Sequence, residues 1–307
     1  MSTFEVLPNE ITLSLGEVSA RVSPQGASLT ELIVAGLTGV EHVSAAAAKH
    51  SFAGATLAPW PNRLKDGEWV FEGKSYRFTN LDSLQNANHG LVFDRTFAVD
   101  NLTKSSVEFL LTLGEDAGYP FRVQFKIGYK LTENGLAASI EVTNLGDEVA
   151  PVAFGAHPYI AIDDNSAISI QAQTQAINDE RKIPIGFEPA SKHQNGDGSA
   201  LRFAGLQIDD CFGELERDRE GIATTTVTHK SGDTVKLWQD ESFKYLMVFA
   251  HHRLGELGMQ SSGLALEPQT APANALQSST DIYMLKPGES KTSKWGISVA
   301  KANKEQQ

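Results

Sequence analysis

Residues 123–143 read VQFKIGYKLTENGLAASIEVT, and this stretch decides the fold class. Apolar side chains occupy every odd position from Val123 to Leu131, and after a break they resume at even positions from Leu136 to Val142. Successive side chains of a strand point to opposite faces, so each half predicts a strand with one buried face. Asn134-Gly135 is a pair that tolerates positive φ, which predicts a β-hairpin with its turn there.

The same kind of signal recurs along much of the chain. Further strands are predicted at 107–113, 224–228, 234–238, 245–249, 282–285 and 295–299. Helical periodicity is scarce, and only residues 44–50, with their run of alanines, predict a short helix. Many short strands between turn residues favour an all-β fold, a large antiparallel β-sandwich with few short helices. No linker or repeat interrupts the pattern, so we expect one domain over residues 1–307.

Composition and charge restrict the partners and the compartment. The net charge of −12 and the lack of a Lys/Arg cluster argue against nucleic acid, which requires a basic face. The single cysteine, Cys211, cannot form an internal disulfide. Residues 1–5 lack the basic, apolar start of a signal peptide, and no apolar stretch is long enough to span a bilayer. We therefore expect a cytoplasmic protein without a membrane partner; the sequence carries no signal for an oligomeric state.

Two residues stand out as candidates for acid-base chemistry. Glu267 follows the apolar run 264–266 and precedes a proline, at the end of a predicted buried strand. A buried carboxylate is costly unless it is paired, so Glu267 belongs either to a structural salt bridge or to a reactive site. His157 lies among small and aromatic residues before Pro158. It titrates near neutral pH and fits either an acid-base role or a core histidine.

Three more polar residues are candidates with plain structural alternatives. His89 lies between Asn88 and Gly90, which could simply form a turn. Arg63 could anchor a loop at the surface. Asp210 could belong to an exposed acidic turn.

No metal or cofactor motif is present. His251-His252 is a pair without further ligands at zinc spacing, and there is no Cys-x-x-Cys. The sequence also lacks a glycine-rich phosphate loop and the G-x-S-x-G elbow of serine hydrolases. We expect neither a metal nor a cofactor.

Five segments together resemble the aldose 1-epimerase family, and they occur in the order of that family. They are Pro61-Asn62-Arg63, Asn88-His89-Gly90, Ala156-His157-Pro158-Tyr159, Asp209-Asp210 with Phe212, and Leu266-Glu267-Pro268-Gln269. The resemblance extends over most of the chain and implies a galactose mutarotase-like β-sandwich, the supersandwich. It also implies an isomerase of carbohydrate metabolism that interconverts the α and β anomers of a free sugar.

The resemblance assigns roles by position. It makes Glu267 the general base, His157 the general acid and His89 a hydrogen-bonding group near the ring oxygen. Sugar hydroxyls would be held by Arg63, Asn62 and Asp210. Ring opening removes a proton from the anomeric hydroxyl and delivers one to the ring oxygen, so a base and an acid must reach different edges of one sugar.

Two alternatives share this fold. A hexose-6-phosphate 1-epimerase would need additional cations for the phosphate, and Arg95 is one candidate. A non-catalytic sugar-binding protein would not require a matched acid and base. Three aromatic residues are candidates for stacking on the sugar: Trp60, Phe212 and Trp238.

Overall fold

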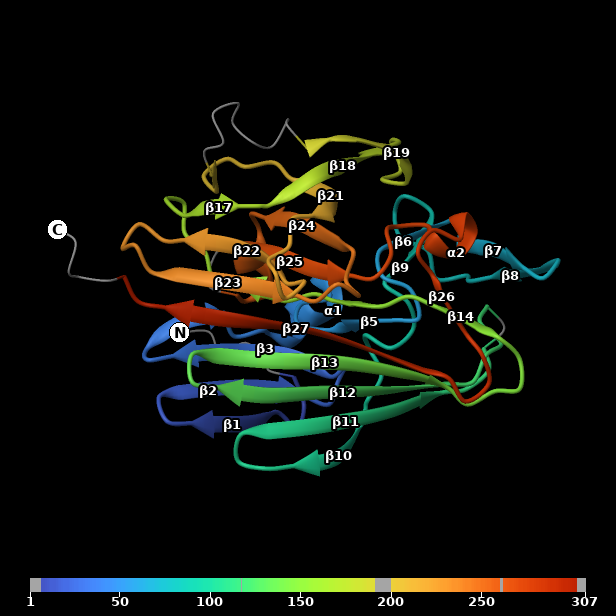
Figure 1. Cartoon of the computed structure of the whole chain (residues 1–307), viewed down its shortest axis with the longest axis horizontal. Coiled ribbons are helices and arrows are strands. Elements are labelled where there is room, and N and C mark those ends of the chain that lie inside the picture. Colours follow the sequence, from blue (N-terminus) through green and yellow to red (C-terminus); the bar gives the residue numbers. More distant parts are fainter. Residues whose placement is uncertain (1–6, 117, 191–199, 260–261, 303–307) are drawn as a thin grey trace.

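Two large antiparallel sheets stacked face to face form the body of the molecule (Figure 1). The computed structural model describes residues 7–116, 118–190, 200–259 and 262–302. The all-β prediction is confirmed. In these residues the first sheet has 12 strands. Its main path runs β1 (Ile11–Leu15), β2 (Val18–Ser23), β3 (Ser28–Val34), β4 (Leu37–Val40), β16 (Tyr159–Ile160), β25 (Gly263–Gln269), β24 (Tyr245–His251), β21 (Asp209–Leu215), β18 (Ala172–Asn178), β19 (Pro184–Pro189). Off this path, β15 (Gly155–Ala156) pairs with β25, and β5 (Thr56–Leu57) pairs with β15.

The second sheet has nine strands among the described residues. Their order is β10 (Ala98–Leu102), β11 (Ser106–Leu113), β12 (Val123–Thr132), β13 (Gly135–Asn144), β27 (Ser290–Ala300), β23 (Thr234–Gln239), β22 (Ala223–Thr228), β17 (Ala167–Ser169), β20 (Leu201–Arg202). Three strand pairs lie outside the two sheets: β6 (Arg63–Lys65) with β9 (Asn86–Asn88), β7 (Glu68–Phe71) with β8 (Lys74–Arg77), and β14 (Ala150–Val152) with β26 (Tyr283–Leu285). The helical elements given for the described residues include α1 (Ala45–Ser51), α2 (Ala275–Ser278) and the 3-10 turn η2 (Leu254–Leu257).

The predicted hairpin is β12–β13, in which Leu131 pairs with Leu136. Its turn lies in the predicted segment, at Glu133-Asn134, but neither Asn134 nor Gly135 has the positive φ that was expected there. Gly135 is needed for a different reason: a Cβ at this position would lie 1.9 Å from the carbonyl oxygen of Ile297 on β27. The glycine thus serves close strand packing and not a left-handed turn.

The short helix predicted at residues 44–50 is also present as α1. Ser44 caps it by accepting the backbone N–H of Ala47 at 3.1 Å, which satisfies one of the free donors of the first turn. No helix among the described residues is long and apolar enough to cross a membrane.

Strand alternation separates the core from the site. On β24, Leu246 and Val248 face the second sheet and belong to the main core. Met247 and Phe249 face the opposite side. The outward face of the 12-stranded sheet is where the candidate site lies.

Candidate active site

A cavity of about 410 Å³ lies on this outward face. Glu267 enters it from β25, where it pairs with Met247 of β24. Its neighbour Leu266 points the other way, into the core. Side chains alternate between the two faces of a strand, so when Leu266 faces the core, the carboxylate of Glu267 faces the cavity.

The cavity is closed by segments distant in sequence. Helix α1 contributes His50 and Ser51. The segments around β6 and β9 contribute Asn62 and Arg63 from the first sequence motif, and Asn88 and His89 from the second. The cavity contains five of the six predicted site residues: Glu267, His157, His89, Arg63 and Asn62. The other lining residues are His50, Ser51, Phe52, Asp82, Asn88, Tyr159, Asp209, Met247, Phe249 and His251.

His157 and Glu267 form a direct buried pair. His157 Nε2 lies 3.2 Å from Glu267 Oε1, and their side chains are only 4% and 3% exposed. Gln269 Nε2 donates to the second carboxyl oxygen, Oε2, at 2.9 Å. Both carboxyl oxygens therefore have partners, and the contact with His157 can hold a proton on either atom.

Burial shifts the two pKa values of this pair in opposite directions. It raises the pKa of Glu267 to about 8 and lowers the pKa of His157 to about 3. Loss of hydration is the main cause in both, because burial penalises the charged form of each group. Both shifts favour the neutral pair, with its proton on Glu267. The pair thus keeps a single proton at neutral pH and titrates as a unit.

His89 is held as a neutral hydrogen-bond donor. Its Nδ1 accepts the backbone N–H of Asn62 at 3.1 Å, and burial keeps its pKa well below the ordinary value. A neutral imidazole that accepts at Nδ1 carries its proton on Nε2. The His89 and His157 rings are 5.3 Å apart between centroids. His89 can therefore offer its Nε2–H to a ligand bound beside His157.

Three lining residues have left-handed backbones although none is glycine. Their φ values are 54° for Phe52, 58° for Asn62 and 59° for His89. Such conformations cost on the order of 1 kcal/mol each, least for asparagine, and they tend to cluster where function requires a particular side-chain direction. Here these backbone conformations direct the side chains of Phe52, Asn62 and His89 toward the same cavity.

Arg63 lies between two carboxylates but is too far from either to form a hydrogen bond with it. Its Nε lies 3.8 Å from Asp82 Oδ2, and its Nη2 lies 3.8 Å from Asp209 Oδ2. Both distances exceed that of a hydrogen bond. The guanidinium is thus oriented by charge while it keeps N–H donors for a ligand.

The structure corrects the prediction for Asp210. Asp209 lines the cavity, and Asp210 does not. Asp210 pairs with Val248 on β24, so its side chain lies on the core-facing side of β21. Adjacent residues of a strand point to opposite faces, and the sequence alone did not tell which of the two acids faces the site.

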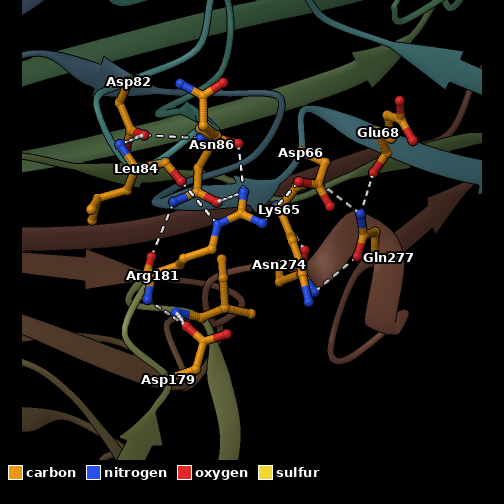
Figure 2. Close-up of polar contacts among 12 residues, drawn as sticks. Lys65, Asp66, Glu68, Asp82, Leu84, Asn86, Asp179, Arg181, Asn274 and Gln277 are labelled. Carbon is orange, nitrogen blue, oxygen red and sulfur yellow. Dashed lines mark hydrogen bonds and ion pairs between the residues drawn. The ribbon is translucent and has the colours of Figure 1, made fainter.

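Arg181 does not line the cavity, but it anchors the segment between β8 and β9 through the hydrogen bonds drawn in Figure 2. Its Nε donates to the carbonyl of Leu84 at 2.9 Å, and its Nη2 donates to Gln85 O at 2.7 Å and Asn86 Oδ1 at 3.0 Å. Asn86 returns a hydrogen bond to the Arg181 carbonyl at 3.0 Å. Because β9 pairs with β6, with Asn88 opposite Arg63, this clamp fixes the position of Arg63 and of His89, which follows β9.

Sequence reasoning missed His251, which it had considered only as half of a metal-binding pair. His251 Nδ1 accepts the backbone N–H of Arg253 at 3.2 Å, and its Nε2 lies 3.2 Å from Ser51 Oγ. It lines the cavity at the end of β24. The signal was the odd-numbered alternation 245–251, which would have placed His251 and Glu267 on one face had the pairing of the two strands been known.

The three aromatic candidates for sugar stacking do not line this cavity. Phe212 is 1% exposed and lies in the main core. Trp238 covers Gly296 in the other sheet. Trp60 is 2% exposed and lines a neighbouring cavity.

His89, His157 and Glu267 form a cluster that the sequence did not suggest as a metal site. One potential ligand atom from each lies within 4.8 Å of the others. The hydrogen bond from Asn62 argues against an ion there, because it occupies the Nδ1 lone pair of His89 and leaves the proton on Nε2. Binding a metal would require breaking that bond.

Comparison with known proteins gives a consistent result. Residues 9–298 match the model of the family described as aldose 1-epimerase. The uncharacterized protein YihR of Escherichia coli K12 is 28% identical over 286 residues, covering 91% of this chain and 89% of that protein. An aldose epimerase homologue from C. elegans has a TM-score of 0.83 at 19% identity, covering 96% of this chain and 99% of the other. A galactose 1-epimerase from Lactobacillus acidophilus NCFM has a TM-score of 0.79 at 16% identity, covering 98% of each chain.

Proposed function

This chain belongs to the aldose 1-epimerase family, and we propose that it interconverts the α and β anomers of a free hexose by opening and reclosing the sugar ring. The family makes it an isomerase that acts on sugars. The observation that carries the finer proposal is the buried contact of 3.2 Å between His157 Nε2 and Glu267 Oε1. A binding protein has no need for a matched base and acid in one cavity.

The proposed reaction is a balanced pair of proton transfers. Glu267 takes the proton of the anomeric hydroxyl as the bond between C1 and the ring oxygen breaks. His157 gives a proton to that ring oxygen, and a free aldehyde results. Rotation about C1–C2 followed by reclosure from the other face returns both protons and inverts the anomeric centre.

The single proton of the pair suits this cycle. A protonated Glu267 with neutral His157 has the same proton count as a carboxylate with an imidazolium, and the short contact allows one form to become the other. We assign His89 Nε2–H to the ring oxygen. Asn62, Arg63 and Asp209 are assigned to the sugar hydroxyls, with Asp209 replacing the residue predicted from the sequence.

The charges around the cavity favour a neutral sugar over a sugar phosphate. Asp82 and Asp209 flank Arg63, and Lys182 Nζ lies 3.4 Å from Asp209 Oδ2, so these two carboxylates offset the two cations. Arg95, the cation considered for a phosphate, is not among the lining residues. A dianionic phosphate would therefore meet carboxylates that repel it.

Anomer exchange across a panel of sugars tests this function. Saturation-transfer NMR on galactose, glucose and their 6-phosphates should show faster exchange for the free sugars. Preference for the phosphates would assign the chain to hexose-6-phosphate epimerisation. Binding without exchange would make it a sugar-binding protein.

A further inference from the structure

Residues 179–183 form a tight loop between β18 and β19 that contacts two elements of the catalytic cavity. Asp179 closes the loop, because its Oδ1 accepts two backbone N–H groups of the loop at 2.8 and 3.0 Å, the first of them from Arg181 (Figure 2). From this turn Arg181 binds the segment before β9, and Lys182 places its Nζ 3.4 Å from Asp209 Oδ2 on β21. The loop thus reaches both the β6–β9 side of the cavity and the acid on its other side.

The backbone of Lys182 is left-handed, with φ at 63°. Glycine and asparagine adopt this conformation at the lowest cost in free energy, and a long side chain is uncommon there. Arg181 and Lys182 are consecutive cations, yet they contact different elements, the first the segment before β9 and the second β21. We infer from this that the side chain of Lys182 is needed at Asp209, since the turn itself would form more easily with a smaller residue.

Lys182 and Arg63 approach the same oxygen of Asp209. Lys182 Nζ lies 3.4 Å and Arg63 Nη2 lies 3.8 Å from Asp209 Oδ2. Neither contact involves Oδ1, the other carboxylate oxygen. Two cations from separate elements, β6 and the β18–β19 loop, therefore restrain the carboxylate and leave Oδ1 to accept a hydroxyl of a sugar in the cavity that Asp209 lines.

The charge of Asp209 also acts on the catalytic carboxyl. Asp209 on β21 and Glu267 on β25 line one cavity from either side of β24. The charge of Asp209 helps to raise the pKa of Glu267, and that of Arg63 lowers it. The charged groups that face Asp209 are Arg63 from β6, Lys182 from the loop and Glu267 from β25, with Asp82 beyond Arg63. A cation held at Asp209 therefore limits the repulsion that Glu267 feels on ionising.

We propose that Lys182 is a positioning residue of the catalytic site, which orients Asp209 toward the sugar and offsets the charge that Asp209 exerts on the His157–Glu267 pair. The proposal rests on the function proposed above and adds to its site a residue that does not line the cavity. Lys182 reaches the sugar only through Asp209. Its loss should therefore alter affinity and pH dependence more than the chemical step.

Lys182→Met tests this role, because it keeps the length of the side chain and removes the charge. KM should rise by about threefold, as for loss of a partly exposed ion pair, with kcat within about twofold of the parent value. The alkaline limb of kcat/KM should move to higher pH by roughly 0.3 to 0.5 pH units, because Glu267 then ionises beside a less compensated Asp209. Lys182→Arg keeps the charge and should restore both quantities.

Lys126→Met is the matched control. Lys126 Nζ lies 3.5 Å from Asp100 Oδ2 with a side chain 37% exposed, close to the 3.4 Å and 40% of Lys182, but in the nine-stranded sheet. It should leave KM and the alkaline limb unchanged. An unmoved limb in Lys182→Met, a limb that moves to lower pH, or a Lys182→Arg protein that behaves like Lys182→Met would overturn the proposal.

A titration without substrate separates this proposal from the proposed function. The ¹³C NMR signal of the Glu267 carboxyl reports its ionisation directly, and its midpoint should rise in Lys182→Met and not in Lys126→Met. If the parent protein exchanges no anomers of any sugar, the proposed function fails, yet this rise still supports the link from Lys182 through Asp209 to the pair. If anomers are exchanged and neither KM nor the midpoint changes in Lys182→Met, only the role of Lys182 is wrong.

Discussion

His157 Nε2 lies 3.2 Å from Glu267 Oε1, and the rest of the cavity is built around this contact. Burial pushes both groups toward their neutral forms. His157 and Glu267 therefore share one proton between them and do not form a permanent ion pair. This distinction determines how activity and stability respond to pH.

The pH profile should show a plateau through neutral pH and an alkaline fall. The pair holds one proton between about pH 3, the pKa of His157, and about pH 8, the pKa of Glu267. Above pH 8 that proton is lost and no acid remains, so kcat/KM should fall by about tenfold per pH unit. Saturation-transfer NMR from pH 6 to 10, corrected for spontaneous exchange, measures this. A rate that instead rises through pH 8 would contradict the shared-proton assignment.

Glu267→Gln should stabilise the folded protein at neutral and alkaline pH. Burial raises the pKa of Glu267 from 4.5 to about 8 in the fold. Its contribution to stability is therefore full below pH 4.5 and is lost as the pH rises through 8, because the unfolded chain ionises first. Each pKa unit corresponds to about 1.4 kcal/mol. The gain should thus reach a few kcal/mol at pH 8 and vanish near pH 4.

Urea unfolding of parent and variant across this pH range measures that gain. Glu133→Gln, in the exposed turn of the β12–β13 hairpin, is the control and should change little at any pH. An unchanged difference between parent and Glu267→Gln from pH 4 to 8 would show that the carboxyl is not buried in the neutral form.

The elements predicted correctly are those that depend on interactions between residues close in sequence. The alternation of apolar residues predicted the β12–β13 hairpin, and the serine before a run of alanines predicted α1. The position of the hairpin turn was predicted correctly, but its conformation was not, because the requirement for glycine at Gly135 comes from β27, a strand far along the chain. Long-range packing of this kind leaves no local signal.

The candidate site shows the same division. Its histidines and Glu267 were predicted individually, while their contact depends on how β25 and the segment after β15 come together. To decide whether Asp209 or Asp210 faces the cavity, one must know which face of β21 is turned toward it. Arg181 had no signal at all, because its role arises only from hydrogen bonds to a segment about one hundred residues earlier.

Asp209→Asn should weaken sugar binding and also shift the pH profile. Asp209 helps to orient Arg63, and its negative charge contributes to the raised pKa of Glu267. Loss of that charge should raise KM by roughly tenfold and move the alkaline limb of kcat/KM to lower pH. Asp210→Asn, measured per folded molecule, should leave both quantities near the parent values. The reverse outcome would restore the assignment to Asp210.

Arg181→Met should reduce activity although Arg181 does not line the catalytic cavity. The change removes the hydrogen bonds to Leu84, Gln85 and Asn86, so the β6–β9 pair that carries Arg63 loses its anchor. Misplacement of a binding group should lower kcat/KM by about tenfold, with KM affected more than kcat. Arg202→Met, which removes a hydrogen bond to Asn165 at the surface, is the control. Equal effects of the two variants would reduce Arg181 to a general structural role.

The acid-base assignment predicts that Glu267→Gln and His157→Asn each fold, bind sugar and lose catalysis. A glutamine amide can donate to His157 Nε2 while its oxygen accepts from Gln269, so Glu267→Gln reproduces the protonated carboxyl but cannot take a proton. General acid-base groups contribute about 10²–10⁴-fold each, so kcat should fall on that order in either variant. Because the two residues act as one unit, the double variant should be little slower than either single one. Kd from calorimetry should stay near the parent value in Glu267→Gln. Normal anomer exchange in a well-folded Glu267→Gln protein would leave the pair as a structural contact and remove it from the mechanism.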